Sequence, residues 1–306
     1  MTPLEHASNH RAAWLAHKVG AFMHFLPDAD TLRFVGQMEV NALADQLAEA
    51  AADYFIFTFG QNTGFYNAPN PVFDALVGYQ PGERCATRDL VGEIAAACRQ
   101  RGIRFMTYLP CQVANKDLRA AHALGFPDDL PRDHEITRQG RDNWAKVIEY
   151  WSKAYGTLIS GWWFDGAYDH LAFDAETSIL YATAAKAGNP NAICAFNGGL
   201  DTFRVLPGDD YTSGEIADAL AFDVNGANDY GIQSHCLTYL GDYWGETNCR
   251  FDDDQLVEWA LRLTRKGCAI SLDMGFNRDA EAAPFGTFSQ RQFRQFKAIC
   301  SAINHQ

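Results

Sequence analysis

The sequence contains no Cys-x-x-Cys pair, although it has eight cysteines. Without paired spacing, neither a zinc knuckle nor a redox dithiol is expected, so we predict buried, reduced thiols. No apolar stretch reaches the roughly 18 residues of a membrane-spanning helix. The first residues also lack a basic stretch followed by an apolar run. The sequence therefore predicts a cytoplasmic protein with no membrane partner.

Positive charge is scarce as well, with 25 Lys and Arg against 38 Asp and Glu and a net charge of −13. Nucleic-acid binding depends on clustered basic side chains that release counterions from phosphates. The charge balance therefore argues against a nucleic-acid partner and favours a neutral or cationic ligand. The charge balance sets no limit on the oligomeric state, and it is compatible with an oligomer.

Strand-like and helix-like segments alternate along the chain, which is typical of a parallel sheet with crossover helices. A Gly-x-Gly-x-x-Gly turn, which often follows the first strand of a doubly wound sheet, is absent. Helices are expected at residues 41–51, 87–101, 141–154, 175–186, 254–266 and 289–303. Strands are expected at residues 19–25, 54–59, 104–109, 161–165, 192–196, 210–212, 235–240 and 268–272.

Eight strands in a chain of 306 residues predict an α/β fold, a single-domain (β/α)8 barrel of the TIM type. We assign residues 17–306 to the barrel and residues 1–16 to an N-terminal extension. The sixth strand, around Asp210, is short, with at most one helical turn expected after Glu215.

Polar residues follow the expected strands where such a barrel carries its active site, at the C-terminal strand ends. They are His24, Gln61, Asn62, Cys111, Gln112, Asp165, Tyr168, Asn197, Asp210, Glu215, Asp242, Trp244, Glu246, Asp273 and Asn277. Asp165 differs from the others because Trp162, Trp163 and Phe164 precede it on its strand. Apolar walls around a carboxylate favour a catalytic role, whereas an Asp followed by Gly166 is also an ordinary turn.

Several segments resemble the α-L-fucosidases of glycoside hydrolase family 29. Residues 161–166, Gly-Trp-Trp-Phe-Asp-Gly, resemble the family's Trp-Phe-Asp-Gly motif, whose Asp is the nucleophile. Residues 18–25 resemble its opening strand, whose His, here His24, binds the sugar. Residues 87–103, 266–272 and 286–288 resemble a helix and the closing segments of the same family. The similarity runs in order from about residue 17 to residue 300.

This resemblance implies a retaining exo-glycosidase that removes a terminal α-L-fucosyl or related residue by double displacement, without a cofactor. Asp165 would be the nucleophile. Residues 210–216 resemble a segment that carries the acid/base Glu in some members, which makes Glu215 the first choice. Glu246 is the runner-up and is equally open to a binding role. The alternative for Glu215 is helix N-terminal capping next to Ser213.

The remaining binding residues are also implied by the resemblance and by their position. His24, Gln61, Asn62 and Asn197 would position sugar hydroxyl groups. Trp163, Tyr168 and Trp244 are candidates for stacking on sugar rings, and they could equally be packing residues. The alternative for His24 is a buried ring bonded to the backbone. Metal catalysis is not expected, because strand 1 has a single His where metal-dependent barrels place a His-x-His pair.

Three departures put the substrate in doubt. Gln61 and Asn62 stand where the family has two adjacent His, and neither can carry a positive charge. Phe25 replaces a Trp, and no C-terminal β-sandwich is visible. Two alternatives therefore stay open: a catalytically silent carbohydrate-binding barrel, and a glycosidase of the same mechanism acting on another sugar such as an α-L-galactoside.

Overall fold

The computed structural model describes residues 11–29, 32–61, 63–113, 117–126 and 136–305. Its strands are all parallel and form one curled sheet in the order β5-β4-β3-β2-β1-β7-β6. They are β1 (Val19–Met23), β2 (Tyr54–Thr58), β3 (Arg104–Pro110), β4 (Ile159–Asp165), β5 (Ile193–Asn197), β6 (His235–Tyr239) and β7 (Ala269–Asp273).

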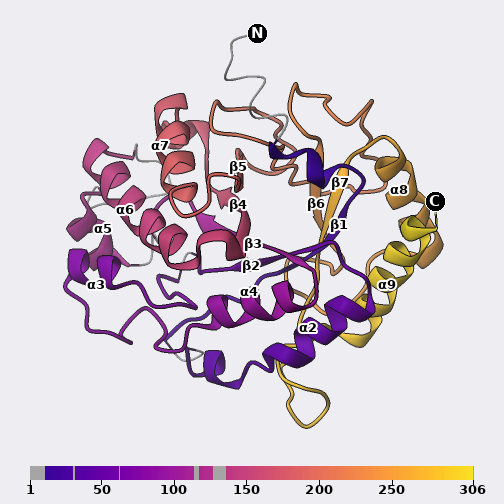
Figure 1. Cartoon of the computed structure of the whole chain (residues 1–306), viewed down its shortest axis with the longest axis horizontal. Helices are drawn as coiled ribbons and strands as arrows, with labels where there is room; N and C mark the ends of the chain where they lie inside the picture. Colours follow the sequence, from indigo (N-terminus) through magenta and orange to yellow (C-terminus); the bar gives the residue numbers. More distant parts are fainter. Residues whose placement is uncertain (1–10, 30–31, 62, 114–116, 127–135, 306) are drawn as a thin grey trace.

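The α-helices lie outside this curled sheet and surround it (Figure 1). They are α2 (Val40–Glu49), α3 (Pro71–Val77), α4 (Leu90–Gln100), α5 (Leu118–Leu124), α6 (Arg138–Tyr155), α7 (Ala175–Ala185), α8 (Asp253–Arg265) and α9 (Gln290–Asn304). Short 3-10 turns occur at η1 (Ala13–Leu15), η2 (Leu32–Gln37), η3 (Gly156–Leu158) and η4 (Asp169–Leu171). Six of these α-helices were expected, and α3 and α5 were not.

The sixth barrel position is irregular and is filled by residues 209–216. The carboxylates of Asp209 and Asp210 accept the N–H groups of Phe196 and Cys194 on β5, at 2.7 and 2.9 Å. On the other side, isolated parallel bridges join residues 211 and 215 to residues 233 and 237. The chain is thus a (β/α)8 barrel, as predicted, in which side-chain carboxylates replace part of one backbone ladder.

After Glu215 the chain forms no regular helix, and its one turn comes at residues 218–222, where the N–H of Phe222 bonds the carbonyls of Asp218 and Ala219 at 3.2 and 3.1 Å. The backbone carbonyl of Glu215 accepts the N–H of Asp201 at 2.8 Å. The N–H of Ala217 donates to the side chain of Asp201 at 3.2 Å. These bonds tie residues 215–217 to the loop that follows β5, so the turn begins only after them and does not extend into a helix.

Alternation along the strands divides the core into two clusters. Side chains that point into the barrel, among them Phe22, Tyr54 and Trp163, form one buried cluster, which also includes Ala12 and Leu15 of the N-terminal segment. Side chains of the opposite face pack against the helices in the other cluster. All eight cysteines are free. Among the described helices, none is both long and apolar enough to cross a membrane.

Candidate active site

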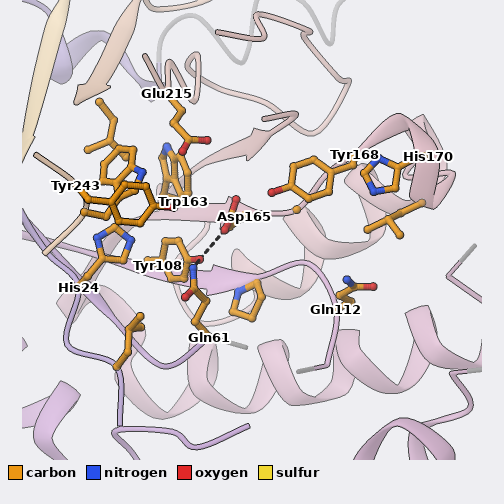
Figure 2. A pocket seen from close by; sticks show the side chains of 16 residues that line it. His24, Gln61, Tyr108, Gln112, Trp163, Asp165, Tyr168, His170, Glu215 and Tyr243 are labelled. Carbon is orange, nitrogen blue, oxygen red and sulfur yellow. Dashed lines mark hydrogen bonds between the residues drawn. The ribbon is translucent and has the colours of Figure 1, made fainter. Parts of the chain in front are cut away.

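A cavity of about 530 Å³ opens at the C-terminal ends of the strands. Figure 2 shows carboxyl groups at its centre and rings on both sides. It is lined by His24, Leu26, Gln61, Tyr108, Pro110, Gln112, Trp163, Asp165, Gly166, Tyr168, His170, Leu171, Glu215, Leu237, Tyr243 and Trp244.

Asp165 is the last residue of β4 and lies on the same strand face as Trp163, two residues before it. Its Oδ2 accepts a hydrogen bond from the hydroxyl of Tyr108 at 2.6 Å. That hydroxyl accepts one in turn from Nε2 of Gln61, also at 2.6 Å. The three side chains point toward one another in Figure 2. Burial and the negative charge of Asp165 raise the pKa of Tyr108 well above its usual value, so Tyr108 stays a donor to this carboxylate.

Asn197, the last residue of β5, lies beside Asp165 in the sheet register. Its Nδ2 donates to Oδ1 of Asp165 at 3.0 Å and also to Oε2 of Glu215. Its Oδ1 accepts the N–H of Gly199 at 3.2 Å, which sets the orientation of the amide. A hydrogen bond spans about 3 Å, so carboxyl oxygens that share one nitrogen are at most about 6 Å apart.

Glu215 reaches this position because its chain segment packs tightly on β6. Gly214 has a φ of +64°, and a Cβ there would lie 2.0 Å from the carbonyl oxygen of His235. The indole N–H of Trp163 donates to the carbonyl of Ser213 at 2.9 Å, which holds the same turn from inside the barrel. The side chain of Glu215 is therefore directed toward Asn197 by a backbone path that only glycine accommodates.

The proton affinity of Glu215 is strongly altered. Burial, followed by the negative charge of Asp165, raises the pKa of Glu215 to about 7, although the Asn197 hydrogen bond lowers it. A carboxyl group in this state holds a proton near neutral pH and can donate it. Asp165 and Glu215 are thus neighbouring acids in different environments, which is how sites assign different roles to two carboxyl groups.

His24 lines one side of the cavity and is oriented by a carboxylate. Its Nδ1 lies 2.9 Å from Oδ1 of Asp273, and Oδ2 of Asp273 accepts the N–H of Gly245 at 2.6 Å. The Trp244 ring contacts the His24 ring edge-on, with centroids 5.4 Å apart. The partner of His24 is therefore a side chain, and the backbone-bonded alternative is not what the structure has.

The opposite side comes from the loop between β4 and α7. The Tyr168 and His170 rings are stacked there, with centroids 5.1 Å apart and planes 19° apart. Figure 2 shows this pair across the carboxyl groups from His24 and Tyr243. His24, which can bond a hydroxyl group, thus lies on one side together with the Tyr243 and Trp244 rings, and the Tyr168–His170 stack lies on the other.

The structure brings most of the expected residues together. His24, Gln61, Trp163, Asp165, Tyr168, Glu215 and Trp244 line the cavity, and Asn197 contacts both carboxyl groups. Glu246 is exposed and lines a separate depression with Asn277. Asn62 lies outside the described residues. Within the described ranges, no group of three or more His, Cys, Asp or Glu side chains could hold a metal ion.

Sequence reasoning missed Tyr108, Tyr243 and His170 and gave Asp273 no role. Tyr108 comes two residues before the end of β3, so a search limited to strand ends passes over it. The available signal was alternation, because every second residue of a barrel strand faces the interior. Tyr243 lies in a loop and His170 in the short 3-10 turn η4, and neither segment carries a comparable periodicity in the sequence.

A scan against protein-family models finds no match, and a search of curated proteins finds none either. Solved structures do match. The endo-fucoidan hydrolase MfFcnA9 of glycoside hydrolase family 107 has a TM-score of 0.78 at 18% identity, covering 98% of this chain and 64% of that one. The family 107 endo-fucoidan hydrolase MfFcnA4 has a TM-score of 0.76 at 18% identity, covering 96% and 53%.

A variant of the α-L-fucosidase AlfC, solved with Fucα(1,6)GlcNAc, has a TM-score of 0.64 at 15% identity, covering 97% of this chain and 98% of that one. The chain spans between about half and two thirds of the length of the two fucoidan hydrolases. At these identities the likeness concerns the fold, and it does not single out the fucosidase family that the motifs resemble. The barrel described here is one that solved fucoidan hydrolases and α-L-fucosidases share.

Proposed function

We propose that this chain is a retaining glycoside hydrolase that cleaves a terminal α-L-fucosyl residue by double displacement. One observation carries the proposal: the carboxyl groups of Asp165 and Glu215 meet on a single amide nitrogen inside the cavity. The resemblance of the strand motif and the barrel shared with fucose-acting hydrolases support the choice of sugar.

The separation of the two acids favours retention over inversion. Retaining enzymes hold their carboxyl groups about 5–5.5 Å apart, and inverting ones about 6.5–9.5 Å apart, to leave room for water. Because the Asp165 and Glu215 oxygens share one donor, their limit of about 6 Å lies below the inverting range. Direct attack by a carboxylate therefore fits better than attack by a water between them.

In the first step Asp165 would attack the anomeric carbon and form a glycosyl ester, while the bond to the leaving oxygen breaks. Glu215 gives that oxygen its proton, so the leaving group departs as a neutral alcohol. In the second step the Glu215 carboxylate takes a proton from water, and the hydroxide oxygen displaces Asp165. Two inversions give net retention, and Glu215 ends protonated as it began.

The neighbouring side chains support these roles. The hydroxyl of Tyr108 holds Asp165 in place, and Gln61 holds Tyr108. His24, oriented by Asp273, faces the cavity and can bond a sugar hydroxyl. Gln61 stands where the family has a His. Its amide donates to the Tyr108 hydroxyl, so Gln61 acts on the sugar mainly by holding Tyr108 in place.

The test is hydrolysis of 4-nitrophenyl α-L-fucoside, with the matched α-L-galactoside alongside and the first sugar anomer followed by NMR. We expect release of nitrophenol from the fucoside and the α-anomer as first product. The β-anomer as first product would show inversion. Faster release from the galactoside would reassign the sugar, and binding without release would identify a silent carbohydrate-binding barrel.

A further inference from the structure

The loop between β4 and α7 carries the stacked Tyr168 and His170 rings, both of which line the cavity. The hydroxyl of Tyr168 points toward Asp165, and His170 lies farther out along the same side (Figure 2). His170 is exposed, whereas Tyr168 is half-buried. The stack therefore runs from the reacting centre to the rim.

This loop is held in one shape by Arg204. The guanidinium donates to the carbonyls of Ala167 and Phe173, at 2.7 and 3.1 Å, and also bonds the side chain of Asp169. These contacts come before, within and after the stack, so a single side chain fixes the loop at both ends. A loop ordered before the ligand arrives loses less entropy when it binds.

The two sides of the cavity suit different parts of a glycoside. His24 and Gln61 are polar and are fixed by Asp273 and Tyr108, as hydroxyl recognition requires. Across the carboxyl groups, the outer His170 ring is exposed, lines the cavity and is held by its stack on Tyr168. Sugar rings present apolar C–H faces that pack on such rings. The group beyond the cleaved bond must extend toward the rim, where this ring lies.

We propose that the Tyr168–His170 stack binds the sugar ring of the leaving group. The inference rests on the proposed function and extends it, because it assigns a fucosyl disaccharide or longer saccharide as the substrate class. A simple alcohol or an inorganic leaving group cannot use this surface. Contacts with the departing ring add to the binding energy available for reaching the transition state.

The experiment compares kcat/KM for an α-L-fucosyl disaccharide with kcat/KM for α-L-fucosyl fluoride, whose leaving group has no ring. His170→Ala should lower the disaccharide-to-fluoride ratio by about fivefold, the size expected for one lost stacking contact. His170→Tyr should restore the ratio because it restores a ring. Arg204→Met should lower it as His170→Ala does, since the loop is released.

The matched control is His305→Ala, which removes an exposed His in the turn that follows α9. Its ratio should equal that of the wild type. An unchanged ratio in His170→Ala, or an equal loss in His170→Ala and His170→Tyr, overturns the proposal while leaving the hydrolase intact. If the wild type cleaves neither substrate, the proposed function itself is wrong, and the two failures are thereby distinguished.

Discussion

Asp165 and Glu215 accept hydrogen bonds from the same atom, Nδ2 of Asn197. The amide bridges the two carboxyl groups through this one nitrogen. Because its Oδ1 is occupied by the N–H of Gly199, the amide cannot turn its oxygen toward the carboxyl groups without losing that bond. The site thus holds the two carboxyl groups close together and raises the pKa of Glu215.

The pH dependence of the wild type should report Glu215. With its pKa at about 7, Glu215 loses its proton as the pH rises through neutrality, so kcat/KM for a fucosyl disaccharide should fall above about pH 7. Glu215→Gln should remove this limb and lower kcat/KM by at least about 100-fold. For fucosyl fluoride, which needs no proton on its leaving group, kcat/KM should change far less. Equal losses on both substrates would contradict the acid role.

Asn197→Ala should shift the fall of kcat/KM at alkaline pH to a higher pH. The Asn197 hydrogen bond lowers the pKa of Glu215, and its loss leaves burial and the charge of Asp165 unopposed by this contact. The measurement is the pH profile of kcat/KM on the disaccharide, with Asn191→Ala, an exposed position, as the matched control. A limb that stays in place or moves to lower pH would show that the amide does not tune Glu215.

Gly214→Ala should destabilise the fold and reduce activity together. The added Cβ would lie 2.0 Å from the His235 carbonyl oxygen and 2.7 Å from Cα of Cys236, at a φ of +64°. We expect the free energy of unfolding, measured in urea titrations, to fall by about 1–3 kcal/mol. Gly36→Ala is the control, because its Cβ would meet nothing within 4 Å. Equal unfolding free energies for the two variants would refute this account of the turn.

His235 should make the stability of the barrel depend on pH. Burial lowers the pKa of His235 to about 4, against 6.5 ordinarily, and its ring bonds Ser271 at 2.8 Å. The unfolded chain therefore binds the extra proton first, so stability is lost as the pH falls from about 6.5 to 4 and regained as it rises. The slope contributed is at most about 1.4 kcal/mol per pH unit.

For His235→Asn, urea unfolding at pH 5 and pH 7.5 should show a smaller difference between the two pH values than the wild type does. The difference between the proteins isolates His235 from the carboxyl groups that titrate in the same range. The same difference in both proteins would mean that His235 is not the group responsible.

The regular barrel strands follow from sequence because their apolar runs and flanking helices repeat the same pattern. Residues 54–58 are all buried, and such runs indicate interior strands. The sixth position could not be predicted in detail, since the carboxylates of Asp209 and Asp210, rather than a periodic strand, complete the hydrogen bonding of β5. Side-chain substitution for a backbone ladder leaves no periodic trace.

The residues of the candidate site were likewise predicted only in part. Asp165 and Glu215 were predicted from motif resemblance and strand position, and the structure places both in one cavity. The hydrogen bond from Tyr108 to Asp165 was not predicted. It depends on the register between β3 and β4, which places Tyr108 opposite Trp163. Glu246, the alternative acid, could be separated from Asp165 only once the loop after β6 was placed.

The most direct measurement is covalent trapping with 2-deoxy-2-fluoro-α-L-fucosyl fluoride, followed by peptide mass spectrometry. The fluorine at C2 slows breakdown of the glycosyl ester, so the wild type should accumulate one adduct on the peptide that contains Asp165, and Asp165→Asn should accumulate none. An adduct on another residue, or turnover by Asp165→Asn within about tenfold of the wild type, would contradict the assignment of Asp165 as the nucleophile.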